Sequence, residues 1–172
     1  MGGVLLALSL SAASVSLKLI AGVLAAAGLA SQAAAQGAAP APQPDYHPSM
    51  GDLMTTAVQP RHTKIGLAGA ERNWAYATYE ISELRNAFNR IARTIPMTNG
   101  SDTAALVSTR IKEPIDRVEA AIKAKDAKGF DTAYVALTKA CNTCHETQNK
   151  QFVVIKAPSG SPYPDQDFHA GK

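Results

Sequence analysis

Hydrophobic residues recur along most of the chain at alternating intervals of three and four, the spacing that places them on one face of an α-helix. The pattern is most regular in NWAYATYEISELRNAFNRIART, residues 73–94, and it stops before Pro96 and the turn-forming stretch TNGSD. Glu80 and Glu83 fall outside this pattern, and together with Glu71 they are expected to form a solvated face. We therefore predict a helix with one buried seam, made of Trp74, Ala77, Ile81, Leu84, Phe88 and Ile91.

Three other segments share this periodicity, and each predicts a helix. The first begins near Asp52 and keeps its apolar residues on one side despite an internal proline. The next is capped by Ser101 or Asp102, and Pro114 should kink it without ending it, because the apolar stripe continues in phase. The last long segment is FDTAYVALTKACNTCHETQ, whose seam is Phe130, Tyr134, Leu137, Cys141 and Cys144.

Short links join the four predicted helices, and such links favour antiparallel neighbours. No stretch of the sequence alternates in polarity over enough residues to build a sheet. We predict an all-α fold, an antiparallel four-helix bundle over residues 52–151. An extended tail rich in proline and polar residues, 152–172, should either wrap the bundle or be disordered.

The first 51 residues are expected to lie outside the folded domain. Lys18 is followed by an apolar stretch of signal-peptide length and by small residues that form an A-x-A cleavage site near Ala35. We interpret residues 1–35 as a signal peptide that exports the protein to a bacterial periplasm, and residues 36–51 as a Pro/Ala-rich leader. The alternative is an uncleaved membrane anchor, since about 20 apolar residues can span a bilayer.

Charge and composition exclude several classes of function. The formal net charge is +3, and of the 17 basic and 14 acidic residues only Lys18 falls in the predicted signal. This weak, dispersed charge, with no basic block interleaved with aromatic residues, argues against nucleic acid binding. No Ser-His-Asp order, phosphate-binding loop or paired carboxylates fit the helical interpretation, so the chain is not predicted to be an enzyme.

The motif that carries chemistry is CNTCH, which contains both cysteines of the chain. The form C-x-x-C-H is that of c-type haem attachment. Residues i and i+3 of a helix project to the same side, so the thiols of Cys141 and Cys144 can bond the two vinyl groups on one edge of a porphyrin. His145 can then bind the iron as its proximal ligand. The sequence therefore predicts one covalently bound haem c.

Three other interpretations of the cysteine pair are weaker. A thioredoxin-like redox site expects a βαβ context and a helix N-terminus, whereas this motif lies late in a predicted helix. A zinc site needs further cysteine or histidine ligands, and none stands nearby in the sequence. A disulfide between positions i and i+3 of one helix is geometrically awkward.

A four-helix chain with C-x-x-C-H near the end of its last helix resembles the class II c-type cytochromes, the family of cytochrome c-prime. The resemblance covers the whole predicted bundle. It implies thioether bonds at Cys141 and Cys144, His145 as the proximal iron ligand, and basic residues beside the motif, here Lys139 and Lys150. The class I arrangement does not apply, because it needs a methionine downstream of the motif and none follows here.

The same resemblance implies an Arg-Gln pair near the haem propionates on the first helix, with the distal residue about one turn later. The stretch RHTKI could match this pattern. Arg61 would then be the propionate partner, and His62 stands in the place of the glutamine. Ile65 falls at the distal position, where six-coordinate relatives carry a methionine.

The sixth iron ligand is open between three alternatives. His62 would give a bis-histidine haem, Met54 would give histidine/methionine ligation, and an apolar distal face at Ile65 would leave the iron five-coordinate. The first two predict an electron carrier between redox proteins or a subunit of a larger redox complex. The third predicts a protein that binds nitric oxide or carbon monoxide. A haem-free helical interaction module and a homodimer paired through the first two helices are further alternatives.

Overall fold

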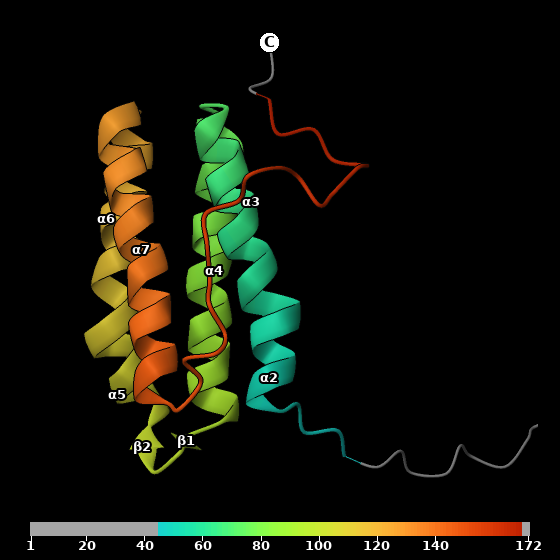
Figure 1. The fold of residues 1–172 in the computed structure, drawn as a ribbon, viewed down its shortest axis with the longest axis vertical. Helices are drawn as coiled ribbons and strands as arrows, with labels where there is room; N and C mark the ends of the chain where they lie inside the picture. The colour runs from blue at the N-terminus through green and yellow to red at the C-terminus, as the bar shows by residue number, and fades with distance from the viewer. Residues whose placement is uncertain (1–44, 170–172) are drawn as a thin grey trace, which may run out of the picture. The chain divides into compact units, whose positions relative to one another are not determined.

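Four helical segments follow one another in the computed structural model of the chain, which describes residues 45–169 (Figure 1). The first segment consists of α2 (Met50–Leu53), η2 (Met54–Val58) and α3 (Gln59–Ala70), and the second is α4 (Trp74–Thr94). The third consists of α5 (Thr103–Leu106), η3 (Val107–Ile111) and α6 (Lys112–Ala124), and the fourth is α7 (Ala127–Thr147). The prediction of an all-α chain with four helices is confirmed.

The helices begin at residues whose side chains satisfy free backbone N–H groups. Ser49 and Asp52 form a capping box at the start of α2, in which each side chain accepts a hydrogen bond from the other residue's backbone N–H. Asn73 caps α4, Asp126 caps α7, and Asp102, one of the two predicted candidates, caps α5. The first helix thus begins at Met50, two residues before the predicted domain start.

A small hairpin joins the second helix to the third. Strands β1 (Met97–Thr98) and β2 (Ser101–Asp102) pair antiparallel through two residues each. Asn99 and Gly100, which connect them, have φ values of 45° and 76°. An Asn-Gly pair with positive φ is what a tight hairpin turn requires, and glycine adopts this conformation without strain. The turn was expected from TNGSD, but the pairing on either side of it was not.

Two of the helices widen into a π turn shortly before a proline. The π-helical segment η2 ends two residues before Pro60, and η3 ends three residues before Pro114. A proline ring crowds the carbonyl four residues earlier, and these carbonyls belong to Thr56 and Arg110, inside the two π segments. The wider turn accommodates each ring within a continuous helix.

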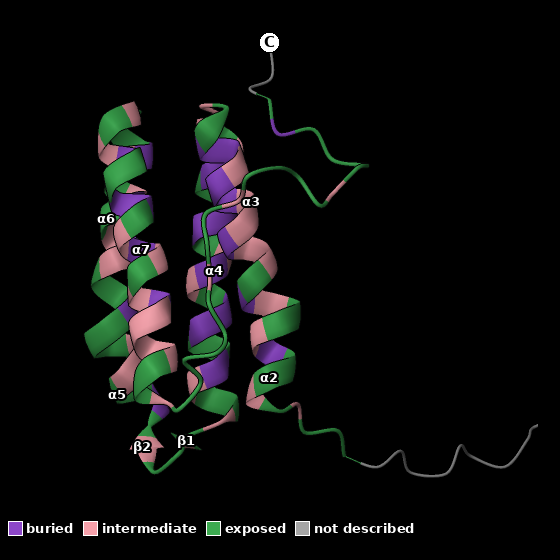
Figure 2. Ribbon diagram, in the orientation of Figure 1, coloured by how far each residue is buried: buried purple, intermediate pink, exposed green. Residues whose placement is uncertain are grey.

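The core lies between the helices. Helix α3 packs on α4, α4 on α6, α6 on α7, and α7 on α3. Buried residues face inward from these helices, and the outer faces are exposed (Figure 2). The seam residues named above are buried, apart from the half-buried Trp74 and Cys144. The apolar stripe of the third segment, from Val107 to Ile122, is buried apart from the half-buried Val107.

The prediction that Glu80 is solvated is wrong. Its side chain is 1% exposed, and Nη1 of Arg61 lies 2.9 Å and 3.1 Å from its two carboxylate oxygens. Arg61 comes from α3, 19 residues earlier, and it compensates the buried negative charge. Glu71 stays exposed and Glu83 is half-buried.

Between α7 and residue 169 the structure describes no helix, and this irregular segment returns along the other helices (Figure 1). The last described residues of this segment are held at the start of α4. Phe168 is buried with its ring centroid 5.3 Å from that of Tyr76, and Nδ2 of Asn73 donates a 2.8 Å hydrogen bond to the carbonyl of His169. The described part of the predicted tail therefore packs on the helices.

The predicted signal peptide 1–35 and residues 36–44 of the predicted leader lie outside the described residues. From Tyr46 onward the chain forms one compact unit. Among the described helices, none is both long enough and apolar enough to cross a membrane.

Candidate haem-binding site

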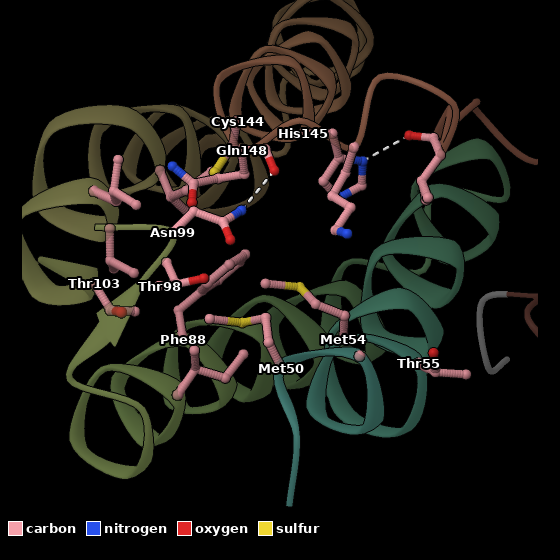
Figure 3. Close-up of a pocket in the computed structure, with 17 residues that line it drawn as sticks. Met50, Met54, Thr55, Phe88, Thr98, Asn99, Thr103, Cys144, His145 and Gln148 are labelled. Carbon is pink, nitrogen blue, oxygen red and sulfur yellow. Dashed lines mark hydrogen bonds between the residues drawn. The ribbon is translucent and has the colours of Figure 1, made fainter. Parts of the chain in front are cut away.

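A cavity of about 370 Å³ opens where the start of the first helical segment meets the end of α4, the η3 turn and the end of α7 (Figure 3). A smaller cavity of about 100 Å³ adjoins it, between the first helical segment and α7. Residues that line both cavities include Met54, Phe88, Ile111, Cys144 and His145. The two π turns therefore lie in the cavity wall, one on each side of it.

Both thiols of the motif are free and lie in the wall of the smaller cavity. Cys141 is buried and Cys144 is half-buried, one helical turn apart on α7. Burial raises the pKa of the Cys141 thiol to about 12 and also raises the pKa of Cys144. Disulfide exchange requires a thiolate, so these surroundings do not suit a thioredoxin-like redox pair.

The imidazole of His145 is oriented by the chain that follows α7. Its Nδ1 lies 2.7 Å from the carbonyl oxygen of Val153, marked by a dashed line in Figure 3. A carbonyl only accepts, so Nδ1 donates in this bond, and a neutral ring then keeps its lone pair on Nε2. Histidines that bind metals usually donate their other ring N–H in this way. The contact therefore suits His145 as a ligand through Nε2.

Two methionines face His145 across the larger cavity. Met54, in η2, and Met50, one turn earlier, both point into the cavity in Figure 3. Only Met54 also lines the smaller cavity, beside both cysteines. Its thioether sulfur is a soft donor suited to haem iron.

His62 is nearly fully buried and lines the smaller cavity as well. Its Nε2 lies 2.9 Å from Oγ1 of Thr138, and its Nδ1 lies 3.2 Å from the hydroxyl oxygen of Tyr134. The rings of His62 and Tyr134 stack with centroids 4.8 Å apart. Burial lowers the pKa of His62 to about 4, so the ring is neutral at pH 7. Coordination of a metal by His62 would break one of these hydrogen bonds.

Of the remaining residues implied by the family resemblance, Arg61, Ile65 and Lys139 do not line these cavities, and Lys150 does. Arg61 is held by Glu80, and Ile65 is fully buried; neither residue lines either cavity. Lys139 is exposed on α7, whereas Lys150 lines the larger cavity. The structure therefore places Met54, and not Ile65, in the same cavity wall as the motif.

The larger cavity also has a polar side that the sequence did not reveal. Thr98, Asn99, Thr103 and Gln148 line it (Figure 3). Oγ1 of Thr103 and Oε1 of Gln148 are buried and have no hydrogen-bond partner within the described part of the chain. Buried polar atoms rarely lack a partner, so this side of the cavity suits the polar groups of a ligand. Isolated Thr and Gln residues carry no sequence signal that could have identified them.

No protein-family model, curated protein or solved structure matches this chain. Within residues 45–169, no group of three or more His, Cys, Asp and Glu side chains could hold a metal ion.

Proposed function

We propose that this protein is an exported monohaem c-type cytochrome that carries single electrons between redox proteins, with its helices arranged as the four-helix bundle of the class II family. One observation carries this proposal. Cys141, Cys144 and His145 lie on the same end of α7 in one cavity wall, with Nε2 of His145 free to bind a metal.

The residues present fit a covalently attached haem. Cys141 and Cys144 would hold it through thioether bonds, and His145 would supply the proximal nitrogen. The apolar side chains of Phe88, Ile91 and Ile111 would contact the porphyrin faces, and the unpartnered hydroxyl of Thr103 could donate a hydrogen bond to its acidic groups. When bound, haem supplies an iron that exchanges one electron without forming or breaking a bond in a substrate.

The cavity geometry favours Met54 over His62 as the sixth ligand, although the sequence suggested the reverse order. Met54 lines both cavities, whereas His62 lines only the smaller one, with both ring nitrogens already in hydrogen bonds. Ile65, on which the five-coordinate alternative depended, is not in the cavity wall. If His145 and Met54 both bound the iron, no position would be left for a gas, so these residues favour an electron carrier over a gas-binding protein.

The visible spectrum of the ferrous protein, produced in a host that attaches haem c, tests this proposal. We expect sharp, split low-spin bands that carbon monoxide does not change. Met54→Leu should give a high-spin spectrum that shifts with carbon monoxide. Met50→Leu, a methionine in the same wall, and His62→Ala should both keep the low-spin spectrum.

Three results would contradict the proposal in different ways. A colourless product, or pigment that acidified acetone extracts, would rule out covalent haem. A wild-type spectrum that shifts with carbon monoxide would favour binding of nitric oxide or carbon monoxide instead. Loss of the low-spin spectrum in His62→Ala alone would assign the sixth ligand to His62.

A further inference from the structure

The chain reverses direction directly after the motif through a Schellman turn. The backbone N–H of Lys150 donates a 2.7 Å hydrogen bond to the carbonyl of His145, and that of Asn149 donates to the carbonyl of Glu146. Asn149, at the position where this turn needs a left-handed residue, has φ 57°. The turn brings residues 150–156, here called the proximal strap, back along the end of α7.

The proximal strap is fastened to α7 a second time by Asn142, which follows the first cysteine of the motif. Its Nδ2 donates a 2.9 Å hydrogen bond to the carbonyl of Ile155, and its Oδ1 accepts a 2.7 Å bond from the N–H of the same residue. This paired contact resembles the bonding between two strands. Asn142 lies three residues before His145, so both side chains project from the same side of the helix.

Val153 lies between these two attachments, and its carbonyl accepts the Nδ1 proton of His145. The Schellman turn fixes one end of the proximal strap, and Asn142 fixes the other. The Val153 side chain is substantially exposed, so side-chain packing does little to hold this carbonyl in place. Its position therefore depends on the 2.8 Å hydrogen bond from the Val153 N–H to the carbonyl of Lys150, on the packing of Ile155 against the core, and on the attachments on either side.

We propose that Asn142 is a positioning residue for the proximal ligand. By holding Ile155 it keeps the Val153 carbonyl on Nδ1 of His145, which fixes the ring orientation and leaves Nε2 as the free nitrogen. Any effect of Asn142 on the iron rests on the proposed function, because it requires bound haem. The position of the proximal strap can be tested without haem.

A trypsin digest of the full-length chain provides the haem-independent test, because trypsin cleaves after Lys150 and Lys156, at the two ends of the proximal strap. We expect Asn142→Ala to raise the cleavage rate at these sites about tenfold, since two hydrogen bonds that oppose local opening are lost. Thr143→Ala, at the other variable position of the motif, is the matched control and should not change it. An unchanged rate in Asn142→Ala would overturn the proposal.

The reduction potential tests the effect on His145. A hydrogen bond from Nδ1 makes the imidazole a stronger donor at Nε2 and favours ferric iron. Asn142→Ala should therefore shift the ferric-to-ferrous equilibrium about three- to tenfold toward ferrous, an increase of about 30 to 60 mV for one electron. Thr143→Ala should leave the potential unchanged. Faster proteolysis with an unchanged potential would overturn the positioning role.

Ile155→Pro disrupts the same contact by changing the proximal strap, and it leaves the attachment motif unchanged. Proline removes the N–H that Asn142 accepts, so the potential and the cleavage rate should change in the same directions. The effects of Asn142→Ala and Ile155→Pro should be less than additive in the double variant, because both act on one contact. Fully additive effects would overturn the proposal. If no variant acquires covalent haem, the proposed function fails, and the protease comparison alone decides on the role of Asn142.

Discussion

The two ends of this helical unit are built differently. At the closed end, near the end of α3 and the start of α7, the rings of Trp74 and Phe130 meet edge-on with centroids 5.8 Å apart. Helix α3 lies so close to Phe130 that a β-carbon at Gly69 would overlap its ring. At the other end the same helices separate around a cavity of about 370 Å³, and residues such as Met54 and Val107 are only half-buried.

The packing of the helices changes from tight to open at the π turns. Beyond η2 and η3 the chain continues as regular α3 and α6, which carry most of the buried hydrophobic residues of the first and third segments. Within the π turns, Met54, Val58, Val107 and Ile111 line the cavities. Tight packing at the closed end therefore maintains the fold, while the other end leaves a cavity lined by the side chains that the proposed function uses.

Gly69→Ala should destabilise the chain by about 3 kcal/mol or more, because the added methyl overlaps the Phe130 ring in a tightly packed region. Gly51→Ala, in the cavity wall, is the control. Its nearest neighbour would be Oγ of Ser49 at 3.7 Å, and alanine favours a helix, so no loss is expected. Urea unfolding followed by circular dichroism measures both. Equal stability of the two variants would refute the tight packing of the closed end.

Acid should destabilise the haem-free chain through His62, which lies between the two ends. The pKa of its ring is about 4 in the folded chain, whereas an unburied histidine has a pKa of 6.5. Below pH 6.5 the unfolded chain therefore binds a proton that the folded chain does not. The free energy of unfolding should fall by up to about 3 kcal/mol as the pH drops from 6.5 to 4, with no further loss from this group below pH 4. In His62→Gln this part of the decrease should disappear when unfolding is followed across the same pH range.

Arg61→Ala should cost about 2 kcal/mol, because it leaves the carboxylate of Glu80 buried without its partner. The cost falls below that of a fully buried pair, since Arg61 is 29% exposed. Arg117→Ala, which breaks an exposed pair with Glu113, should cost less than about 1 kcal/mol. The double variant Arg61→Leu, Glu80→Leu should recover most of the stability in thermal unfolding. A double variant no more stable than Arg61→Ala would show that the unpaired charge is not the cause.

Thr103→Val should raise the stability of the haem-free chain by about 1 kcal/mol, because it replaces a buried hydroxyl that lacks a partner with a methyl group. In the haem-loaded protein the gain should disappear if the hydroxyl bonds the ligand. Thermal unfolding of both forms gives the comparison. A gain of the same size in both forms would show that Thr103 plays no part in binding.

The helices and the attachment motif could be predicted from the sequence because both are encoded locally. The apolar residues from Ala77 to Ile91 follow one regular spacing within a single helix. Cys141, Cys144 and His145 fall within little more than one helical turn. Helical periodicity alone therefore indicated which faces are buried and placed the three motif residues together.

The errors and omissions concern contacts between distant residues. Glu80 was expected in solvent because its partner Arg61 belongs to another helix. Among the three alternatives for the sixth ligand, periodicity could not show that Met54 lies in the cavity wall and Ile65, about three turns later, does not. The bond between His145 and Val153 depends on the course of a tail without periodicity, and such a course cannot be inferred from hydrophobic spacing.

The position of Val153 in the sequence has a consequence for the order in which the chain is synthesised. The carbonyl of Val153 lies eight residues downstream of the histidine that it contacts, so a ribosome completes the whole C-x-x-C-H motif before this partner exists. A chain terminated at Gln151 would contain the whole motif and lack the carbonyl that orients its histidine. The motif and the contact that sets the geometry of its imidazole are therefore encoded in separate segments of the chain.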